Sequence, residues 1–195
     1  KRHEDVIENI EKTNTTTLLI GNSIINYWGG NPKASLARGA DEWSKYMAPI
    51  KVQNAGFGWD RIENVLWRVY HGGLDHFTGK NIVLMIGTNN LGINSDEEIV
   101  EGLQFLINAI KARQPDAKII MVGILPRKKM EEQVKDINAK IKTMSLKNYI
   151  EFVDFGKDFL KGNQINSELF VGDGLHPNAG GYDALGRDLM RLLKK

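Results

Sequence analysis

The sequence predicts an α/β protein in which a five-stranded parallel sheet lies between two layers of helices. Two observations support this fold class. Five short β-rich runs alternate with longer amphipathic helical patterns along the 195 residues. The run 82–86 is apolar throughout, which is typical of a central parallel strand covered on both faces. Because no repeat, low-complexity stretch or linker interrupts this alternation, we expect a single domain over residues 1–195, with residues 1–15 as a leading helix and linker.

The strands are predicted from runs of β-branched and apolar residues. The second run is the weakest, because Val52 is its one β-branched residue. The others are mostly Ile, Val, Leu, Met, Thr and Phe. The five predicted strands cover residues 17–20, 51–54, 82–86, 118–122 and 151–153.

The helices are predicted from apolar residues that recur every three to four positions. After the short leading helix, such stripes run over 62–69, 99–110, 130–144 and 182–192. Asp60 and Glu63 make a plausible capping pair for the first of these stripes, and Ser95 with Glu98 for the second, which Pro115 ends. Residues 26–49, rich in Trp, Gly and Pro, are expected to form a long loop with short helical pieces beside the site.

The composition excludes several classes of protein. Without cysteine, the chain has no disulfide, no thiolate nucleophile and no Cys-bound zinc or iron–sulfur cluster. The net charge of +2 argues against a nucleic-acid partner, and the basic run 127–129 is interpreted as a solvated loop. No apolar run approaches the ~20 residues that span a bilayer. The compartment stays unknown: the chain begins at Lys1 without Met, so a targeting peptide would already be missing, and a secreted or periplasmic bacterial protein fits.

Polar and small residues follow the predicted strands where these end. Ligands bind at the carboxyl ends of strands in open parallel sheets. We therefore expect a site at this edge, built from the segments that follow the first, second, third and fifth strands, which are 21–23, 54–60, 87–90 and 173–177.

Ser23 directly follows the first strand and is expected to open a helix. A serine hydroxyl becomes a nucleophile when a base removes its proton, and a helix N-terminus stabilises the oxyanion that attack creates. The alternative is a simple N-cap serine, which is a common role.

Asp173 and His176 are spaced i, i+3, so one tight turn would bring the carboxylate to the imidazole. The carboxylate would then hold the ring in one tautomer and stabilise the imidazolium. A pair of metal ligands or a loop cap before Pro177 are the alternatives. The other three histidines are expected at the surface.

Asn89 follows a buried strand and a glycine, so its amide could donate to a developing oxyanion, a contribution of roughly 3 kcal/mol in comparable sites. A polar turn is the alternative. Gly56 and Gly58 make half of a dinucleotide-binding loop, but Arg61 stands where the third glycine belongs. We expect these two glycines to let backbone approach a small substrate.

Taken in this order, the four segments resemble the SGNH (GDSL-type) hydrolase family over residues 17–193. The likeness is strongest to its platelet-activating-factor acetylhydrolase-like branch and the related bacterial acyl esterases, including carbohydrate-esterase-like members. Segments 65–68, 87–90, 113–120, 125–127 and 168–171 carry this closer likeness. The resemblance implies a flavodoxin-like three-layer α/β/α sandwich that uses no metal and no organic cofactor.

The resemblance also implies roles for individual residues. Ser23 matches the nucleophile, His176 the general base and Asp173 the residue that orients the base. The oxyanion hole would combine the backbone N–H of Ser23, a backbone N–H of the glycine turn and the side chain of Asn89. Gly58 and Trp59 are the two candidates for the turn donor.

Two positions depart from the family pattern. Asn22 replaces the usual Asp before the serine, and we expect little loss because Asn keeps its size and one acceptor. Trp59 stands where the donor glycine belongs, and its indole would then either line the pocket or cover it. The alternative is that Trp59 packs in the core and Gly58 is the donor. Asn22, Trp59 and Asn90 are predicted to contact substrate.

We therefore expect a serine esterase that hydrolyses short-chain acyl esters, above all acetyl esters, since no long apolar lid is evident. The partner is a small-molecule ester, either an acylated sugar or a lipid. Trp28, Trp43 and Trp59 near the site favour a sugar, and the alternative is that these tryptophans are core residues. Alternatives are a phospholipid or lysophospholipid acylhydrolase and a non-catalytic ligand-binding member. The resemblance leaves a homodimer open.

Overall fold

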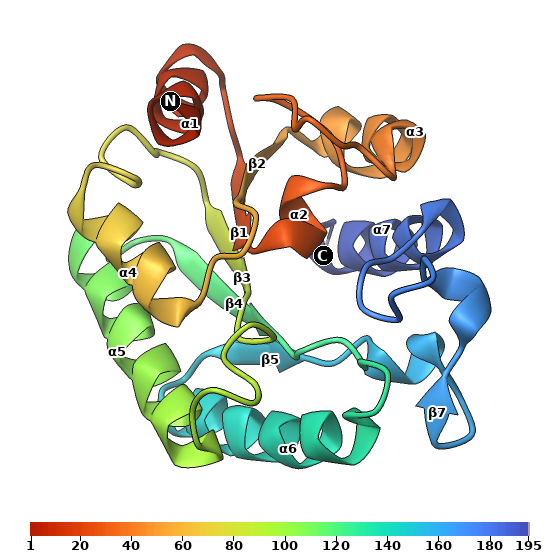
Figure 1. Cartoon of the computed structure of the whole chain (residues 1–195). Coiled ribbons are helices and arrows are strands. Elements are labelled where there is room, and N and C mark those ends of the chain that lie inside the picture. Colours follow the sequence, from red (N-terminus) through yellow and green to blue (C-terminus); the bar gives the residue numbers. More distant parts are fainter. Residues whose placement is uncertain (195) are drawn as a thin grey trace.

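A five-stranded parallel sheet forms the centre of the computed structural model, which describes residues 1–194. The strand order is β2-β1-β3-β4-β5, so β1 lies between β2 and β3, with Thr17 paired to both Val52 and Asn81. The predicted strands and α/β class are confirmed, with strand ends shifted by two residues at most. The strands are β1 (Thr17–Gly21), β2 (Val52–Gly56), β3 (Asn81–Met85), β4 (Lys118–Val122) and β5 (Glu151–Val153) (Figure 1).

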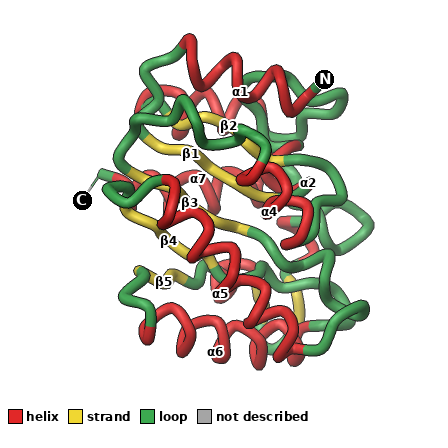
Figure 2. The backbone as a smooth tube through the Cα atoms, turned by 90° about the vertical axis from the view of Figure 1, so that its left-hand side faces the viewer, coloured by secondary structure: helices red, strands yellow, loops and turns green. Residues whose placement is uncertain are grey.

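Helices cover both faces of this sheet, as Figures 1 and 2 show. One face packs against α1 (Arg2–Lys12), α4 (Ile62–Tyr70), α5 (Asp96–Arg113) and α6 (Glu131–Lys147). The other face packs against α2 (Ser23–Asn26), the π-helical turn η1 (Trp43–Met47) and α7 (Ala179–Leu193).

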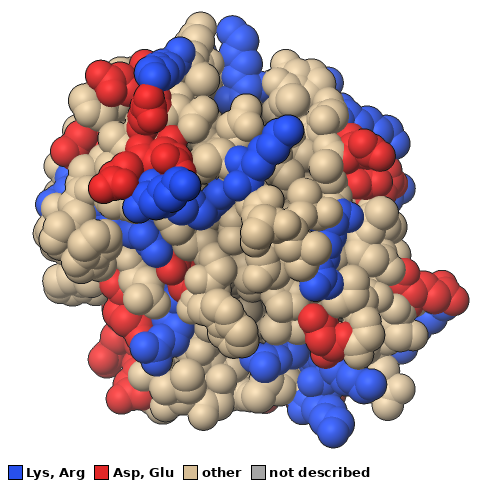
Figure 3. Space-filling model, turned by 45° about the horizontal axis from the view of Figure 1, so that its top comes forward, with Lys and Arg blue, Asp and Glu red and all other residues tan. Residues whose placement is uncertain are grey.

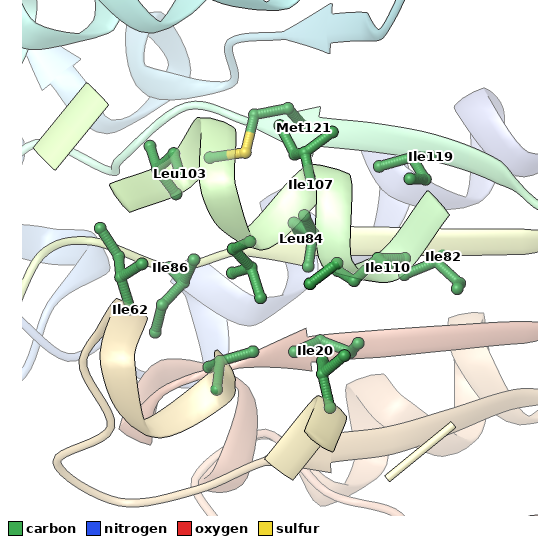
Figure 4. Packing of buried hydrophobic residues seen from close by; sticks show 14 of the residues in the cluster. Ile20, Ile62, Ile82, Leu84, Ile86, Leu103, Ile107, Ile110, Ile119 and Met121 are labelled. Carbon is green, nitrogen blue, oxygen red and sulfur yellow. The ribbon is translucent and has the colours of Figure 1, made fainter. Parts of the chain in front are cut away.

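Alternate residues of each strand enter the two halves of the core, which explains the continuous apolar runs. Ile82 and Leu84 of β3 pack on the α4–α5 side together with Ile107 of α5 (Figure 4), whereas Val83 packs on the α7 side. Each such side chain stabilises the fold by about 1.5–3 kcal/mol through burial.

The ends of α5 are as predicted, but the start of α4 is not. The Ser95–Glu98 capping box is present, with N–H to side-chain oxygen distances of 2.8 and 3.2 Å. The prediction that Asp60 and Glu63 cap α4 is wrong. The backbone N–H of Arg61 instead donates to Asn64 Oδ1 at 2.9 Å, and Asp60 pairs with an arginine two turns along α4.

The segment between α2 and β2 holds short helical pieces, as expected, but its two tryptophans lie in the core. Trp28 is fully buried, stacks on Tyr182 at 5.3 Å between ring centroids and meets Trp43 edge-on at 5.6 Å. A sugar contact by Trp28 or Trp43 is therefore wrong. The remaining short elements are α3 (Ala40–Glu42), η2 (Ala48–Ile50), η3 (Gly156–Phe159), η4 (Ser167–Leu169) and an unpredicted hairpin of β6 (Leu160–Lys161) with β7 (Gln164–Ile165).

Basic and acidic side chains alternate over the face that Figure 3 displays, with broad uncharged areas between them. This pattern agrees with the near-balanced charge of the chain. Among residues 1–194, no helix combines the length and apolar character needed to cross a bilayer.

Candidate active site

The turn from β1 into α2 places Ser23 at the first position of a helix. Asn22 occupies the N-cap, where its side-chain oxygen accepts the backbone N–H of Ile24 at 2.9 Å. Asn22 thus keeps the acceptor that we expected of it. Because Asn22 is buried, the predicted contact of Asn22 with substrate is not supported.

Ser23, His176 and Asp173 form one continuous line of hydrogen bonds. The distance from Ser23 Oγ to His176 Nε2 is 2.9 Å, and His176 Nδ1 lies 2.7 Å from Asp173 Oδ2. An ionised Asp173 accepts a hydrogen bond from the Nδ1–H group, which leaves Nε2 unprotonated and able to accept a hydrogen bond from the serine hydroxyl. The structure therefore brings together three side chains that lie up to 153 residues apart in the sequence.

A tight turn holds the carboxylate of Asp173 in this line. Its Oδ1 accepts the backbone N–H groups of Leu175 and His176, both at 2.9 Å. Partial burial opposes ionisation of Asp173, but these bonds and the His176 side chain hold its pKa below the ordinary value. Gly174 has φ +63°, and a Cβ there would lie 2.6 Å from Lys128 Cβ, so this turn requires glycine.

Aromatic side chains support the serine and the histidine. The rings of Tyr27 and His176 pack at 5.4 Å between centroids. Tyr182 of α7 donates its buried hydroxyl to the backbone oxygen of Ile24 in α2 at 2.7 Å. This bond joins the helix that begins with Ser23 to the helix that follows His176. Sequence reasoning missed both tyrosines, because neither stands in a recognisable motif.

The glycine turn after β2 lies against α2. A Cβ on Gly56 would lie 2.5 Å from the backbone nitrogen of Asn26, so this close approach requires glycine. A Cβ on Gly58 would lie in ordinary contact with Asn26 Nδ2 and Tyr27 Oη, at 3.7 and 3.8 Å.

Trp59 adopts a left-handed backbone, with φ +65°, and its side chain is highly exposed. The alternative in which Trp59 packs in the core is therefore wrong. The indole is instead free to meet a ligand beside the turn.

The two neighbouring amides after β3 have different surroundings. Asn89 Nδ2 donates to the backbone oxygen of Asp60 at 3.0 Å, which engages one of its two amide hydrogens. Asn90 is buried; both of its amide hydrogens go to Glu63 and Asn94, and its oxygen accepts the backbone N–H of a residue in α4. Asn90 therefore braces the loop, and its predicted contact with substrate is not supported.

Within the described residues 1–194, no group of three or more His, Cys, Asp or Glu side chains is placed to hold a metal ion.

Residues 19–184 match the GDSL-like lipase/acylhydrolase family. Platelet-activating factor acetylhydrolase IB subunit alpha2 from Homo sapiens is 31% identical over 170 residues, which cover 84% of this chain and 73% of the relative. The alpha1 subunit from Bos taurus is 28% identical over 169 residues, which cover 84% of this chain and 72% of the relative.

Solved structures share the fold. A GDSL-like lipase from Bacteroides thetaiotaomicron has a TM-score of 0.74 at 19% identity, covering 91% of this chain and 87% of its own. An acetylxylan esterase from Geobacillus stearothermophilus has a TM-score of 0.67 at 15% identity, covering 95% and 96%. From these matches the chain belongs to the GDSL-like lipase/acylhydrolase (SGNH) family and is an ester hydrolase.

Proposed function

We propose that this protein is a serine esterase that hydrolyses short-chain acyl esters, above all acetyl esters, through an acyl-enzyme on Ser23. The observation that carries the proposal is the unbroken line from Ser23 Oγ through His176 to Asp173, with distances of 2.9 and 2.7 Å. These distances lie within the range for proton transfer between a nucleophile and its base.

In the first step, His176 Nε2 takes the hydroxyl proton while Ser23 Oγ attacks the carbonyl carbon of the ester. The electron pair of the C=O bond moves onto the oxygen and makes an oxyanion. Asp173 stabilises the imidazolium that forms, since its lowered pKa keeps it ionised.

Three donors would hold the oxyanion: the backbone N–H of Ser23, the N–H of Gly58 or Trp59, and the second amide hydrogen of Asn89. The first amide hydrogen of Asn89 is engaged by the Asp60 carbonyl, which fixes the plane of the amide. Donors fixed before the reaction need no reorganisation when charge develops.

The intermediate then collapses, and the alcohol leaves with the proton from His176. A water molecule, deprotonated by His176, attacks the acyl carbon. The C–O bond to Ser23 breaks, the carboxylic acid is released and the serine regains its proton.

The acetyl group and a sugar alcohol are the substrate halves that we propose. The names of two kinds of similar protein refer to the acetyl group: the platelet-activating factor acetylhydrolase subunits and the acetylxylan esterase. The exposed indole of Trp59 offers a flat apolar face on which a sugar ring could stack. The lipase in the name of the family favours a second candidate, a phospholipid acylhydrolase.

Hydrolysis of nitrophenyl esters by the Ser23→Ala variant tests the mechanism. We expect that the wild type releases nitrophenol from the acetate ester and that Ser23→Ala loses this activity while remaining folded. Ser44→Ala is the matched control, because Ser44 Oγ is exposed and bonds to the backbone of its own helical turn. Equal activity in Ser23→Ala would disprove the nucleophile assignment.

Substrate panels separate the candidate functions. An acetylesterase should prefer the acetate ester and release acetate from acetylated xylo-oligosaccharides. A phospholipid acylhydrolase should prefer long acyl chains. Saturable sugar binding without any ester cleavage would instead indicate a non-catalytic member.

A further inference from the structure

One arginine outside the Ser–His–Asp line contacts the glycine turn at both of its ends. Arg68 of α4 donates from Nε to Asp60 Oδ2 at 2.8 Å and from Nη2 to Asp60 Oδ1 at 2.9 Å. This fork geometry makes the pair strong and directional. The Asp60 side chain is only 6% exposed and that of Arg68 22%, so solvent screens the pair little.

The same guanidinium also covers the ring of Phe57, with Cζ 3.5 Å from the ring centroid. Phe57 and Asp60 are the residues on either side of Gly58 and Trp59. A single side chain therefore holds both ends of the segment that contains the two candidate turn donors.

Asp60 connects this segment to the next loop. Its backbone oxygen accepts a hydrogen bond from Asn89 Nδ2 at 3.0 Å, so the loop after β2 and the loop after β3 are joined at the side chain proposed as the third oxyanion donor. A shift of Asp60 would thus move the Asn89 amide as well.

The turn needs such support because it is strained. Trp59 has φ +65°, a conformation that is unfavourable for any residue with a Cβ. Strain of this kind persists only where the surroundings hold the backbone in place. Since Trp59 is 85% exposed, the packing of its side chain does little to hold this backbone.

We propose that Arg68 is a positioning residue that sets the turn donor and the Asn89 donor of the oxyanion hole together, through the Asp60 ion pair. This inference rests on the proposed function, because the donor role of Asn89 is part of it. Arg68 acts through Asp60 and touches no reacting atom.

A double-mutant cycle tests the coupling, with kcat for nitrophenyl acetate measured in Arg68→Ala, Asn89→Ala and the double variant. Loss of one oxyanion donor lowers kcat by about 10²–10³-fold in comparable enzymes. We expect Arg68→Ala to lower kcat by about tenfold or more at nearly unchanged KM. In the Asn89→Ala background the effect of Arg68→Ala should shrink by at least about fivefold, because residues in one network couple.

Arg113→Ala is the matched control. The guanidinium of Arg113 also covers an aromatic ring, that of Tyr70 at 4.2 Å, but has no link to the site. Its kcat should equal that of the wild type. Arg68→Lys keeps the charge but cannot form both hydrogen bonds to Asp60, so its kcat should lie between those of the wild type and Arg68→Ala. If Arg68→Ala does not fold, Arg68→Lys replaces it in the cycle.

The outcomes separate the inference from the proposed function. If the two substitutions simply multiply their effects, Arg68 does not act on the Asn89 donor and the inference fails, while the role of Asn89 stands. If Asn89→Ala leaves kcat unchanged, both the donor role of Asn89 and the inference fail.

Discussion

Trp59 combines two properties that seldom occur in one residue, a strained backbone and an exposed aromatic side chain. Neither property stabilises the fold, since the left-handed backbone costs about 1–2 kcal/mol and an exposed indole contributes little burial. We propose that this backbone conformation is retained because the exposed indole contacts substrate.

We predict that Trp59→Gly raises the stability of the fold while impairing activity on acetylated sugars. The substitution relieves the backbone strain, but glycine loses more conformational entropy on folding. The free energy of unfolding should therefore rise by roughly 0.5–1 kcal/mol. Urea unfolding measures this gain. The kcat/KM for acetylated xylo-oligosaccharides should fall, whereas that for nitrophenyl acetate should change much less. A less stable variant would show that the indole packs against the fold.

At the scale of elements, the site depends on how α2 and α7 are joined. The bond from the Tyr182 hydroxyl to the Ile24 backbone oxygen ties them at 2.7 Å. Burial raises the pKa of Tyr182, so the phenol stays neutral and remains a donor.

Tyr182→Phe should therefore lower the free energy of unfolding by about 1–3 kcal/mol, because it leaves a buried carbonyl without its donor. It should also lower kcat more than it changes KM, since α2 carries Ser23. Tyr149→Phe is the control, because the Tyr149 side chain is 98% exposed. If both variants unfold at the same urea concentration, the bond contributes nothing to stability.

Elements were predictable from the sequence where local pattern and tertiary burial agree. The strands β1, β3 and β4 could be located because both of their faces are buried, so apolar runs mark them without reference to any partner. The hairpin of β6 and β7 could not be located, because strands of two residues are too short to show an alternating hydrophobic pattern. The cap of α4 failed for a related reason: Asp60 has the right residue type for capping, but its partner is Arg68, eight residues away.

The candidate site was predictable to a similar extent. Ser23, Asp173 and His176 stand in local motifs, so sequence alone could bring them together. Asn89 and Asn90 are adjacent and chemically identical, and only the packing of α4 against the loop directs one amide into a buried network. The exposure of Trp59 likewise depends on the backbone of its turn rather than on its apolar character.

At the scale of the whole molecule, the pH of the solution acts on stability through several carboxyl groups. Hydrogen bonds from Tyr46 and then Lys45 lower the pKa of Asp183, and a hydrogen bond from Lys140 lowers that of Glu97. Asp173 has a lowered pKa as well. A carboxyl group with a lowered pKa stabilises the fold above its unfolded pKa, and this contribution is lost as the pH falls through its folded value.

We predict that the urea midpoint stays constant between about pH 7 and 5 and falls below about pH 4, where carboxyl groups of unfolded chains titrate. Asp188 opposes this trend, because burial raises its pKa. Added salt should reduce the difference between neutral and acidic midpoints, since Asp183 and Glu97 are exposed and their pairs are screened. A midpoint that rises on acidification would contradict the prediction.

The pH dependence of kcat/KM should differ from that of stability, because it depends on the protonation state of His176. Only a neutral His176 can accept the Ser23 proton, so kcat/KM should fall when the solution is made acidic enough to protonate the base. A profile that is flat from about pH 5 to 8 would argue against histidine as the base.

The bond between Ser23 and His176 spans 153 positions of the chain. During translation, Ser23 is synthesised long before His176. Ester cleavage by a refolding or growing chain would therefore report the closure of a very long loop, an event that entropy makes late. Esterase activity therefore requires that the segment that carries Ser23 and the segment that carries His176 have come into contact.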